Sequence, residues 1–357
     1  MHSEHASLFA AYHHLEPAEP GMVMARVSCV MAKNLLTLVR PDTELDAVVA
    51  GALQHSAREA IDLPVVGDMV LADSRGEKTM VVEVLPRRNI LLRKSVVKDL
   101  QAQAIAANVD VVFVITCFGP DFNLRRLERY VLAVRACGIE CTILINKADL
   151  VESAEIDELL EEIRGILGNV PIHAVSAHTG RGMDGLGAYA TSGQTICFIG
   201  SSGVGKSSLV NALAGEEVMA TSHNRHWDGK GRHTTTMRQM LFLPGGITVI
   251  DTPGMREFAP WIMDESQVSL AFDDLEELAA QCRFGDCTHT AEPGCAVLAA
   301  VDDETLDANR YEAYLKLVEQ TRELQQRRTL RGITERKQRE KSSSKALRKH
   351  LADKGRR

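Results

Sequence analysis

The chain has 357 residues, too many for one ordinary domain, and at about 100–200 residues per domain its length predicts two or three domains. Its 45% hydrophobic and 25% charged residues are typical of a soluble globular protein. No apolar run is long enough to span a membrane, and residues 1–20 lack the apolar stretch of a secretory signal. We therefore expect a cytoplasmic protein with no membrane partner, whose 8 cysteines are reduced thiols or metal ligands rather than disulfides.

The formal net charge of -7 hides an uneven distribution. From Arg322 to the C-terminus there are 14 Lys and Arg against 4 Asp and Glu, which leaves 27 of the 41 cations and 44 of the 48 anions in residues 1–321. A basic end on an acidic body indicates either a solvated helix or a segment that contacts a polyanion, for which nucleic acid is the obvious cytosolic candidate.

Residues 1–20 are expected to be loosely held, and residues 21–98 to form a small β-barrel. Short apolar segments separated by turn signals favour a barrel or a sandwich. An oligonucleotide-binding (OB) barrel is one possibility, which the pattern alone does not distinguish from an SH3-like barrel. The predicted strands are Val23–Val30, Leu35–Val39, Met69–Ala72, Met80–Leu85 and Ile90–Arg93.

Residues 99–260 alternate buried strands with helices, which predicts an α/β domain with a mostly parallel sheet. Residues 261–330 are expected to form a helical domain broken by a cysteine-rich loop, followed by a basic tail, 331–357. The predicted strands of the α/β domain are Val111–Ile115, Cys141–Ile145, Ile172–Ala174, Thr195–Ile199 and Ile247–Ile250, and its predicted helices are Leu124–Cys137, Ser153–Leu167 and one near Met183–Ala190.

A phosphate-binding loop follows the strand Thr195–Ile199. It fits the pattern G-x-x-x-x-G-K-[ST] in full and precedes an apolar helix, Ser208–Leu213, the context that makes a chance match improbable. Loop N–H groups and the helix N-terminus cradle phosphates. We expect Lys206 to reach the β- and γ-phosphates as a catalytic cation and Ser207 to ligate Mg²⁺. The loop residues predicted to bind GTP are Gly200, Ser201, Ser202, Gly203, Val204, Gly205, Lys206, Ser207 and Ser208.

A guanine-reading box is predicted at Asn146-Lys147-Ala148-Asp149, after the strand Cys141–Ile145. It resembles the N-K-x-D box of GTPases. The Asp149 carboxylate can accept from guanine N1–H and the exocyclic amine, whereas adenine would leave it unpaired, so such a site can discriminate by about 10⁴–10⁵. Asn146 braces the loop and the base, the Lys147 stem covers the ring, and Ser176-Ala177 resembles the segment that meets guanine O6. Each short motif alone is most often a surface turn, but together with the phosphate loop they predict a GTP site.

The order of these motifs is unusual, because the guanine box precedes the phosphate loop. In ordinary GTPases the phosphate loop comes first. The same sheet can form from a chain that is cut and rejoined elsewhere, since the termini of compact domains often lie close together. We therefore predict a circularly permuted GTPase domain.

The predicted switch elements lie downstream of the phosphate loop. Asp251-Thr252-Pro253-Gly254 resembles the D-x-x-G box, in which Asp251 orders the Mg²⁺ shell through water and the Gly254 N–H senses the γ-phosphate. The polar stretch Thr221–Thr236 suits an order–disorder switch. Thr234, Thr235 or Thr236 supplies a further Mg²⁺ ligand, and we favour Thr235.

The residue that orients the attacking water in many GTPases, a glutamine after the D-x-x-G glycine, is replaced here by Met255. Hydrolysis must then use another polar group. His233 is the nearest candidate in sequence, although a solvated switch histidine is an equal alternative. In either case, slow intrinsic hydrolysis that a partner stimulates is expected.

Four candidate zinc ligands cluster at Cys282, Cys287, His289 and Cys295, spaced C-x₄-C-x-H-x₅-C. Three thiolates and an imidazole suit tetrahedral Zn²⁺ and leave no open position, which predicts one structural ion rather than a catalytic one. The alternatives are a coincidental cluster and a redox disulfide pair, which would not need His289.

The succession of barrel, N-K-x-D, phosphate loop, Gly231-Arg232-His233-Thr234-Thr235-Thr236, D-T-P-G and cysteine cluster resembles the RsgA or YjeQ family of small-subunit-dependent bacterial GTPases. The resemblance covers about residues 20–330; Met1–Pro20 departs from it. It implies an OB-type barrel, a permuted GTPase domain and a zinc-binding helical domain. It also implies a monomer that binds GTP, GDP, the 30S subunit and its 16S rRNA. GTP hydrolysis would be stimulated by the 30S subunit late in its maturation, with His233 matching a hydrolytic switch histidine.

The residues alone leave two other functions open. A metabolic P-loop enzyme such as a kinase would need a substrate pocket but not the Asn146–Asp149 box. A zinc-stapled RNA-binding module would bind RNA with strong salt dependence and would not turn over GTP.

Overall fold

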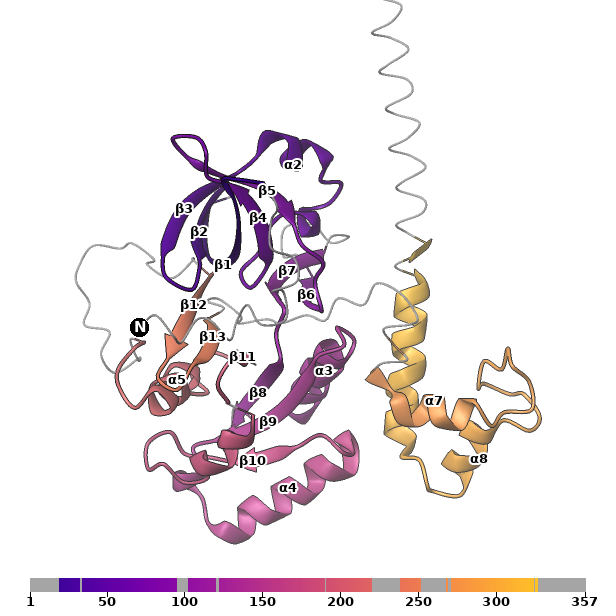
Figure 1. Cartoon of the computed structure of the whole chain (residues 1–357). Coiled ribbons are helices and arrows are strands. Elements are labelled where there is room, and N and C mark those ends of the chain that lie inside the picture. The colour runs from indigo at the N-terminus through magenta and orange to yellow at the C-terminus, as the bar shows by residue number, and fades with distance from the viewer. Residues whose placement is uncertain are drawn as a thin grey trace, which may run out of the picture. The chain divides into compact units, whose positions relative to one another are not determined.

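The computed structural model describes residues 19–32, 34–94, 102–119, 122–189, 191–219, 238–251, 268, 271–323 and 325–326. The chain divides into two compact units, Met1–Trp261 and Ile262–Arg357. Figure 1 shows the strands and most helices of the first unit and the separate helices of the second. No helix within these described ranges is long and apolar enough to cross a membrane.

The first unit begins with a closed five-stranded barrel. Its strand order is β1-β2-β3-β5-β4, and an additional β1–β4 pairing closes it. Alternate residues such as Leu36, Leu38 and Val81 fill the interior. The closed order, with β3 and β5 parallel, is that of an OB-type barrel rather than an open sandwich. The strands are β1 (Met22–Ala32), β2 (Leu35–Val39), β3 (Glu44–Val49), β4 (Met69–Asp73) and β5 (Thr79–Val84), with α2 (Gly51–Ser56) and η2 (Ala60–Asp62) after β3.

The rest of the first unit is a mostly parallel sheet in the order β10-β9-β8-β11-β13-β12, in which only β12 runs antiparallel to its neighbour. Its inner strands β8, β9 and β11 are buried on both faces, as their continuous apolar runs predict. The strands are β8 (Val111–Cys117), β9 (Glu140–Asn146), β10 (Ile172–Ala174), β11 (Thr195–Gly200), β12 (Arg238–Leu243) and β13 (Ile247–Asp251).

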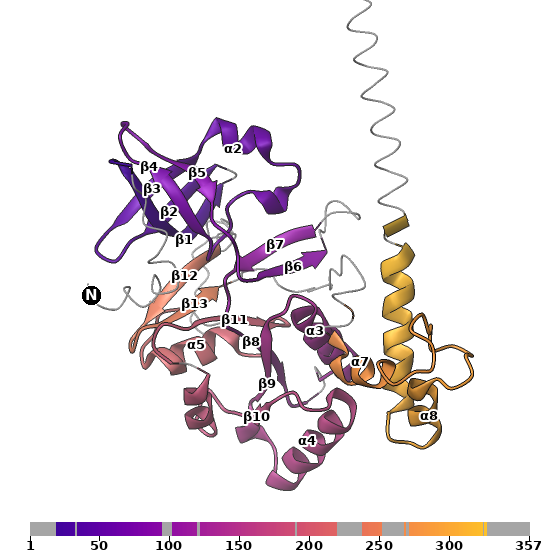
Figure 2. The same cartoon turned by 45° about the vertical axis from the view of Figure 1, so that its right-hand side comes forward.

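Helices cover both faces of this sheet (Figures 1 and 2). Leu127 and Ile163, from α3 (Leu124–Arg135) and α4 (Ser153–Leu167), pack in one core cluster with Val112 and Val114 of β8. In the other cluster, residues of α5 (Lys206–Ala214) and the 3₁₀ helix η4 (Met183–Ala188) pack against Phe113. Successive residues of β8 therefore serve opposite cores, which is the arrangement of an α/β three-layer domain.

Barrel and GTPase sheet are joined by backbone pairing. Strand β12 pairs with β1 through Val30↔Arg238 and Cys29↔Gln239, so a single 11-stranded sheet runs through both parts. The Arg238 guanidinium donates to the Ala104 carbonyl at 2.7 Å. Because Arg238 begins β12, this junction lies at the end of the segment predicted to contain the switch.

One expected barrel strand belongs elsewhere. Ile90–Arg93 forms a strand, β6 (Ile90–Lys94), but it pairs with β7 (Ala102–Ala107) in a separate two-stranded sheet. Leu91 and Ile105 of this hairpin pack in the core cluster that contains α3, so apolar burial draws the hairpin to the α/β domain. The segment near Met183–Ala190 is a 3₁₀ helix, η4, rather than an α-helix.

The second unit contains α7 (Asp273–Ala279), α8 (Ala296–Asp302) and a helix over residues 308–323. Arg310 on that last helix donates twice to Asp274, both at 2.5 Å, and lies over the ring of Phe272 at 4.9 Å. The Tyr314 ring meets Phe272 edge to face at 5.5 Å. These contacts fasten the helix to the start of α7.

Candidate functional site

Parallel pairing brings the predicted nucleotide motifs to one edge of the sheet. Strands β9, β10, β11 and β13 run parallel, so their carboxyl ends lie on the same side. Asn146 ends β9, Ser176 follows β10, Gly200 ends β11 and Asp251 ends β13. Ligands of open α/β sheets bind at this edge, which makes it the candidate nucleotide site.

Asn146 joins the guanine box to two other loops. Its side chain is 3% exposed. The amide nitrogen donates to the Val204 carbonyl of the phosphate loop at 2.8 Å, and the amide oxygen accepts from the Ala177 N–H at 3.2 Å. One side chain thus connects three segments that are 31 and 58 residues apart along the sequence. The sequence predicts that Asn146 braces its own loop; the geometry shows that it braces the phosphate loop as well.

Asp149 is held ready to accept hydrogen bonds. The Ser176 hydroxyl donates to its Oδ1 at 2.5 Å, and this hydrogen bond lowers the pKa of Asp149 below its usual value. Ser176 is fully buried, and its hydroxyl oxygen also accepts from the N–H groups of His178 and Thr179 at 3.3 and 3.1 Å. The carboxylate is therefore ionised at neutral pH and oriented by a rigid partner, as a guanine reader requires.

Arg181 is a residue of this site that sequence reasoning missed. Its guanidinium donates to the Ala148 carbonyl at 3.2 Å and to the Ser153 hydroxyl at 3.3 Å, tying the guanine box to the loop after β10. Lys147, which precedes Ala148, has its backbone in the left-handed region at φ 67. No sequence motif marks an arginine five residues after Ser176. Only its hydrogen bond to the Ala148 carbonyl shows that it ties the two loops together.

The phosphate loop depends on glycine where it passes Asn146. Gly205 has φ +96, and a Cβ there would lie 2.2 Å from the Asn146 amide nitrogen. A side chain would therefore displace the amide that joins the loops, besides straining the backbone. The loop leads into α5, whose Leu209 and Val210 anchor it in the core.

Lys206 points into the phosphate loop. Its ammonium group donates to the carbonyls of Gly200 and Ser201 at 2.8 and 2.7 Å. Burial lowers the pKa of Lys206 to about 8, and the carboxylate of Asp251 partly opposes that shift. A phosphate group that entered the loop would add negative charge beside this partly buried ammonium group.

The remaining predicted site residues divide into those placed at this edge and those not described. Ser207 and Ser208 begin α5 and are partly exposed, while Ser202 and Gly203 are exposed at the tip of the loop. Asp251 is partly exposed at the end of β13. His233, Thr235 and its neighbours, and Gly254 lie outside the described residues, so their predicted roles stay predictions.

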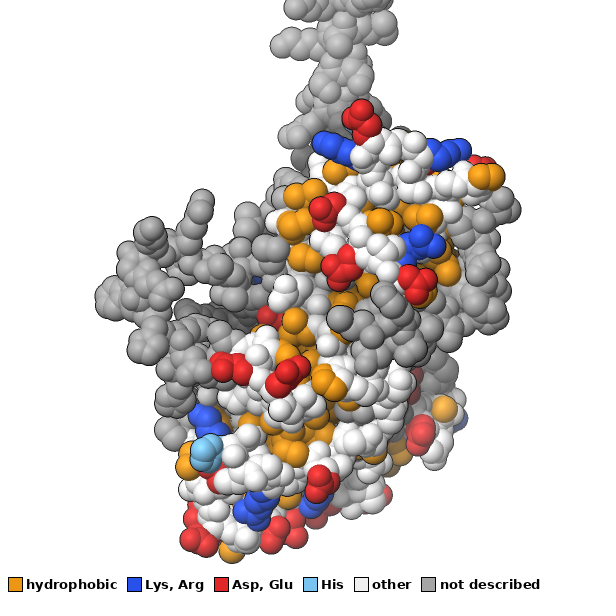
Figure 3. Space-filling model, turned by 60° about the vertical axis from the view of Figure 1, so that its left-hand side comes forward, with side chains coloured by type: hydrophobic (Ala, Val, Ile, Leu, Met, Phe, Trp, Pro, Cys, Tyr) orange, Lys and Arg blue, Asp and Glu red, His pale blue; other side chains and the backbone are white. Residues whose placement is uncertain are grey.

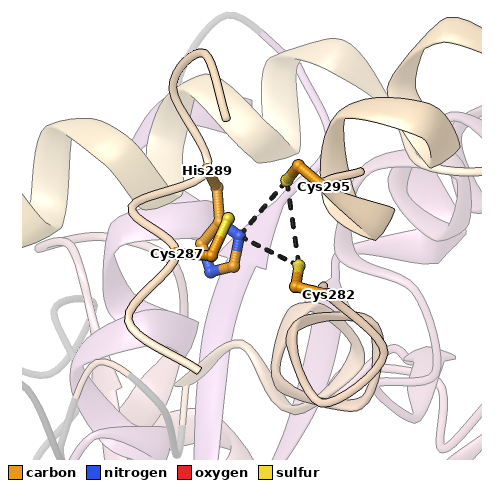
Figure 4. Close-up of side chains that lie close together, drawn as sticks. All are labelled: Cys282, Cys287, His289 and Cys295. Atoms are coloured by element: carbon orange, nitrogen blue, oxygen red, sulfur yellow. Dashed lines mark hydrogen bonds between the residues drawn. The ribbon is translucent and has the colours of Figure 1, made fainter. Parts of the chain in front are cut away.

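A second side-chain cluster lies in the second unit. The ligand atoms of Cys282, Cys287, His289 and Cys295 all lie within 4.8 Å of one another (Figure 4). Cys282 Sγ is 3.8 Å from Cys295 Sγ, and His289 Nδ1 is 3.6 and 3.4 Å from these two sulfurs. All three thiols are free.

The distances among Cys282, His289 and Cys295 match a tetrahedral zinc site, and Cys287 Sγ lies within 4.8 Å of the other three ligand atoms. With Zn–S of about 2.3 Å and Zn–N of about 2.0–2.1 Å, tetrahedral angles put two sulfurs about 3.8 Å apart and a sulfur and a nitrogen about 3.5 Å apart. The observed 3.8, 3.6 and 3.4 Å agree with these values. The donor set and its spacing are thus compatible with zinc.

The loop around this cluster is organised by Glu292. Its carboxylate accepts from the N–H groups of Thr288, Thr290 and Ala291 at 2.9, 3.0 and 3.1 Å, and from the Thr288 hydroxyl at 2.5 Å. The hydrogen bonds with Thr288 do most to hold the pKa of Glu292 far below its usual range. These contacts support His289, whose backbone has φ 58.

Two family profiles match this chain, and between them they span the nucleotide motifs and the cysteine cluster. The profile described as "RsgA GTPase" matches residues 84–261, and one described as "50S ribosome-binding GTPase" matches residues 195–339. The small ribosomal subunit biogenesis GTPase RsgA of Methanosarcina acetivorans is 42% identical over 306 residues, covering 85% of this chain and 81% of that protein. This chain belongs to the RsgA GTPase family. The predicted resemblance to this family is thereby confirmed, and a metabolic kinase is excluded.

Other RsgA relatives and solved structures agree. The RsgA of Opitutus terrae is 42% identical over 310 residues, covering 84% of each chain. The crystal structure of YjeQ from Thermotoga maritima matches 84% of this chain and 98% of its own with a TM-score of 0.63 at 26% identity. The structure of YloQ, a circularly permuted GTPase, matches 87% of this chain and 97% of its own with a TM-score of 0.60 at 22% identity and so shows the fold. The predicted permuted GTPase fold is confirmed.

Proposed function

We propose that this RsgA-family GTPase binds the small (30S) ribosomal subunit and hydrolyses GTP to GDP and phosphate during late 30S maturation, at a rate that the subunit stimulates. The observation that carries the proposal is the junction at Asn146, which joins a guanine-reading box to a phosphate loop at one sheet edge. The names of the 42%-identical relatives supply the small subunit as the partner.

The base of the nucleotide would bind between the two loops that Asn146 connects. Asp149 accepts from guanine N1–H and the exocyclic amine, and Ser176 keeps that carboxylate ionised and oriented. The stem of Lys147 covers the ring, and the backbone of Ala148 and Ala177 completes the pocket. Because adenine lacks matching donors, ATP would leave the acceptor positions of Asp149 that face the base without a partner.

The phosphates would bind along residues 200–208. Lys206 would exchange the carbonyls of Gly200 and Ser201 for the β- and γ-phosphates. Mg²⁺, which accompanies GTP, neutralises developing charge on the phosphates. Ser207 and Thr235 would ligate it, and Asp251 would orient its water shell.

Hydrolysis would rely on the segment between the phosphate loop and the D-x-x-G box. Gly254 would sense the γ-phosphate, and His233 would position the attacking water in place of the glutamine that Met255 replaces. Slow turnover without a partner follows, because a switch residue acts only when its segment is ordered around the nucleotide.

The second unit would hold one structural zinc ion through Cys282, Cys287, His289 and Cys295. We propose a GTPase part, 99–260, and a zinc domain, 261–330, flanked by residues 1–20 and the basic tail 331–357; of the part 21–98 predicted as the barrel, strand β6 packs with the GTPase part instead. The tail's excess of Lys and Arg supports contact with 16S rRNA. We propose a cytoplasmic monomer.

The test is GTP hydrolysis by the purified chain alone, with 30S subunits and with 50S subunits, with ATP as the nucleotide control. A large increase specific to 30S and GTP is expected. Equal stimulation by both subunits, or none, would refute the small-subunit assignment. The 50S control is needed because the description of one matching profile names the 50S ribosome.

A change of Asp149→Asn tests the guanine reader directly. The amide N–H₂ introduced at position 149 would face the exocyclic amine of guanine, donor against donor, whereas xanthine has an acceptor oxygen at that position. Preference is therefore expected to move from guanosine to xanthosine nucleotides. Unchanged preference in a competition assay would show that Asp149 does not read the base.

A further inference from the structure

The barrel carries a cluster of exposed apolar side chains. Among the described residues six large hydrophobic side chains are exposed, and four of them belong to the barrel. They are Met31 (36%), Leu35 (41%), Met80 (40%) and Val82 (36%). Apolar residues scattered singly over a surface are ordinary, whereas a contiguous set marks an interaction site.

Strand register makes these side chains contiguous. Leu35 on β2 pairs with Val48 on β3, and Val48 pairs with Met80 on β5. Neighbouring strands lie about 4.8 Å apart, so the three form one line across the outside of the barrel. Val82 continues it along β5, and Met31 flanks it where β1 meets β2. We name Met31, Leu35, Val48, Met80 and Val82 the apolar row.

The apolar row takes no part in the barrel core. The core cluster of the barrel and the partly buried residues packed against it include none of its five members. Their neighbours along the strands, such as Leu36, Ala47 and Val81, are buried in it. The apolar row therefore contributes little to the stability of the barrel. Barrel stability does not explain why five apolar side chains face outward.

The charged side chains within strands β2, β3 and β5 of the apolar row are all acidic. Strands β2, β3 and β5 contain Glu44, Asp46 and Glu83 and no Lys or Arg. All three carboxylates are exposed. Figure 3 shows this side of the first unit, with hydrophobic, acidic and some basic side chains interspersed over the barrel. On β3, Glu44 and Asp46 alternate with buried residues and so share the outward face with Val48.

We infer that the apolar row and its carboxylates bind a basic protein surface that carries apolar side chains, rather than RNA. OB-type barrels that bind oligonucleotides use the face of strands 2 and 3, with cations for the phosphates and aromatic rings for the bases. Here β2, β3 and β5 offer neither a cation nor an aromatic ring. An apolar centre with an acidic rim complements a basic protein. The inference rests on the proposed function, since the 30S subunit presents such proteins beside its rRNA.

Two double variants test it, each measured for affinity to purified 30S subunits and to protein-free 16S rRNA. Leu35→Thr with Met80→Thr removes apolar contact, and threonine is compatible with strands. It is expected to weaken 30S binding at least about tenfold, as truncation of buried interface anchors does, and to leave rRNA binding unchanged. Full-length protein is used, with its thermal transition and GTP affinity checked against wild type.

The double variant Glu44→Lys with Asp46→Lys is expected to change affinity in opposite directions for a basic protein and for RNA. Against a basic protein, reversal of two rim charges is expected to weaken 30S binding about tenfold. Against rRNA, the same change would tighten binding and steepen its salt dependence. Tighter binding would overturn the inference. This variant also decides the question if the threonine variant does not fold.

The matched control is Glu158→Lys with Glu162→Lys on α4, which makes the same charge change on exposed positions. Figures 1 and 2 show α4 at the opposite end of the first unit from the barrel. It is expected to leave 30S affinity at or above the wild-type value, and an equal loss would overturn the inference. If wild type itself does not bind 30S, the proposed function fails and the inference with it. If wild type binds and both barrel variants bind equally well, the inference alone fails.

Discussion

Asn146→Ala would break the junction between the guanine box and the phosphate loop. The side chain is 3% exposed and makes two hydrogen bonds, to the Val204 carbonyl at 2.8 Å and from the Ala177 N–H at 3.2 Å. Its removal leaves one acceptor and one donor without these partners. At about 1–3 kcal/mol for each group left unsatisfied, the two groups together should cost the nucleotide-free chain about 2–6 kcal/mol of unfolding free energy.

Affinity for GTP should fall with stability, because the same amide holds both halves of the site in register. We expect a loss of about 10- to 100-fold, which corresponds to about 1.4–2.7 kcal/mol. Denaturant unfolding of the nucleotide-free protein measures the first quantity, and titration with a fluorescent GTP analogue measures the second.

Asn123→Ala is the matched control. Asn123 is exposed and caps α3 by accepting from the Arg126 N–H at 2.8 Å. Loss of this cap should cost about 1 kcal/mol of stability and leave GTP affinity unchanged. If Asn146→Ala changed stability no more than Asn123→Ala, the buried junction would be energetically unimportant. If it lowered stability but left GTP affinity intact, the loops it joins would not be the nucleotide site.

Three further predictions concern the loop, its lysine and the cysteine cluster. Gly205→Ala should weaken GTP binding by about 1–3 kcal/mol through strain and displacement of Asn146; Gly203→Ala, also at positive φ but with open space, should weaken it less, and equal losses would refute the clash. Burial holds the pKa of Lys206 at about 8, against 10.5 normally, so between these pH values the unfolded state binds more protons and this group's stability contribution rises with pH. GTP should restore the ammonium charge, and calorimetry near pH 8–9 in buffers of different ionisation enthalpy should show proton uptake, whose absence would contradict this. Cys282→Ser should lower bound zinc from one ion per chain by elemental analysis and destabilise the second unit while GTP affinity persists, whereas full zinc occupancy would remove Cys282 from the ligand set.

The sequence pattern predicts strands most accurately where they are buried on both faces. The predicted strands Val111–Ile115 and Cys141–Ile145 lie within β8 and β9, because a continuous β-branched run leaves few other conformations. Ser153–Leu167 was predicted with both bounds of α4. Amphipathic spacing over four turns is a strong signal.

The strands that the pattern missed have weaker local signals. Strand β3 carries two acidic residues among its six, and β7 is Ala-Gln-Ala-Ile-Ala-Ala, a composition that by itself favours a helix. Their pairing partners, β2 and β6, hold them as strands. Strand β12 follows a polar segment and is likewise held between β13 and β1. Tertiary pairing decided these elements against or without local propensity.

The sequence by itself determined the chemistry of this protein: a phosphate loop, a guanine box placed before it, and four zinc-ligand candidates at a closed spacing. Those motifs are local, because each is a short run of residues whose side-chain types carry the function. Only the tertiary structure decided how they meet. It placed the Asn146 amide on the phosphate loop, Arg181 against Ala148, β6 outside the barrel, and Leu35, Val48 and Met80 in one line. These contacts join residues far apart along the chain, and strand register, which no single segment encodes, sets them.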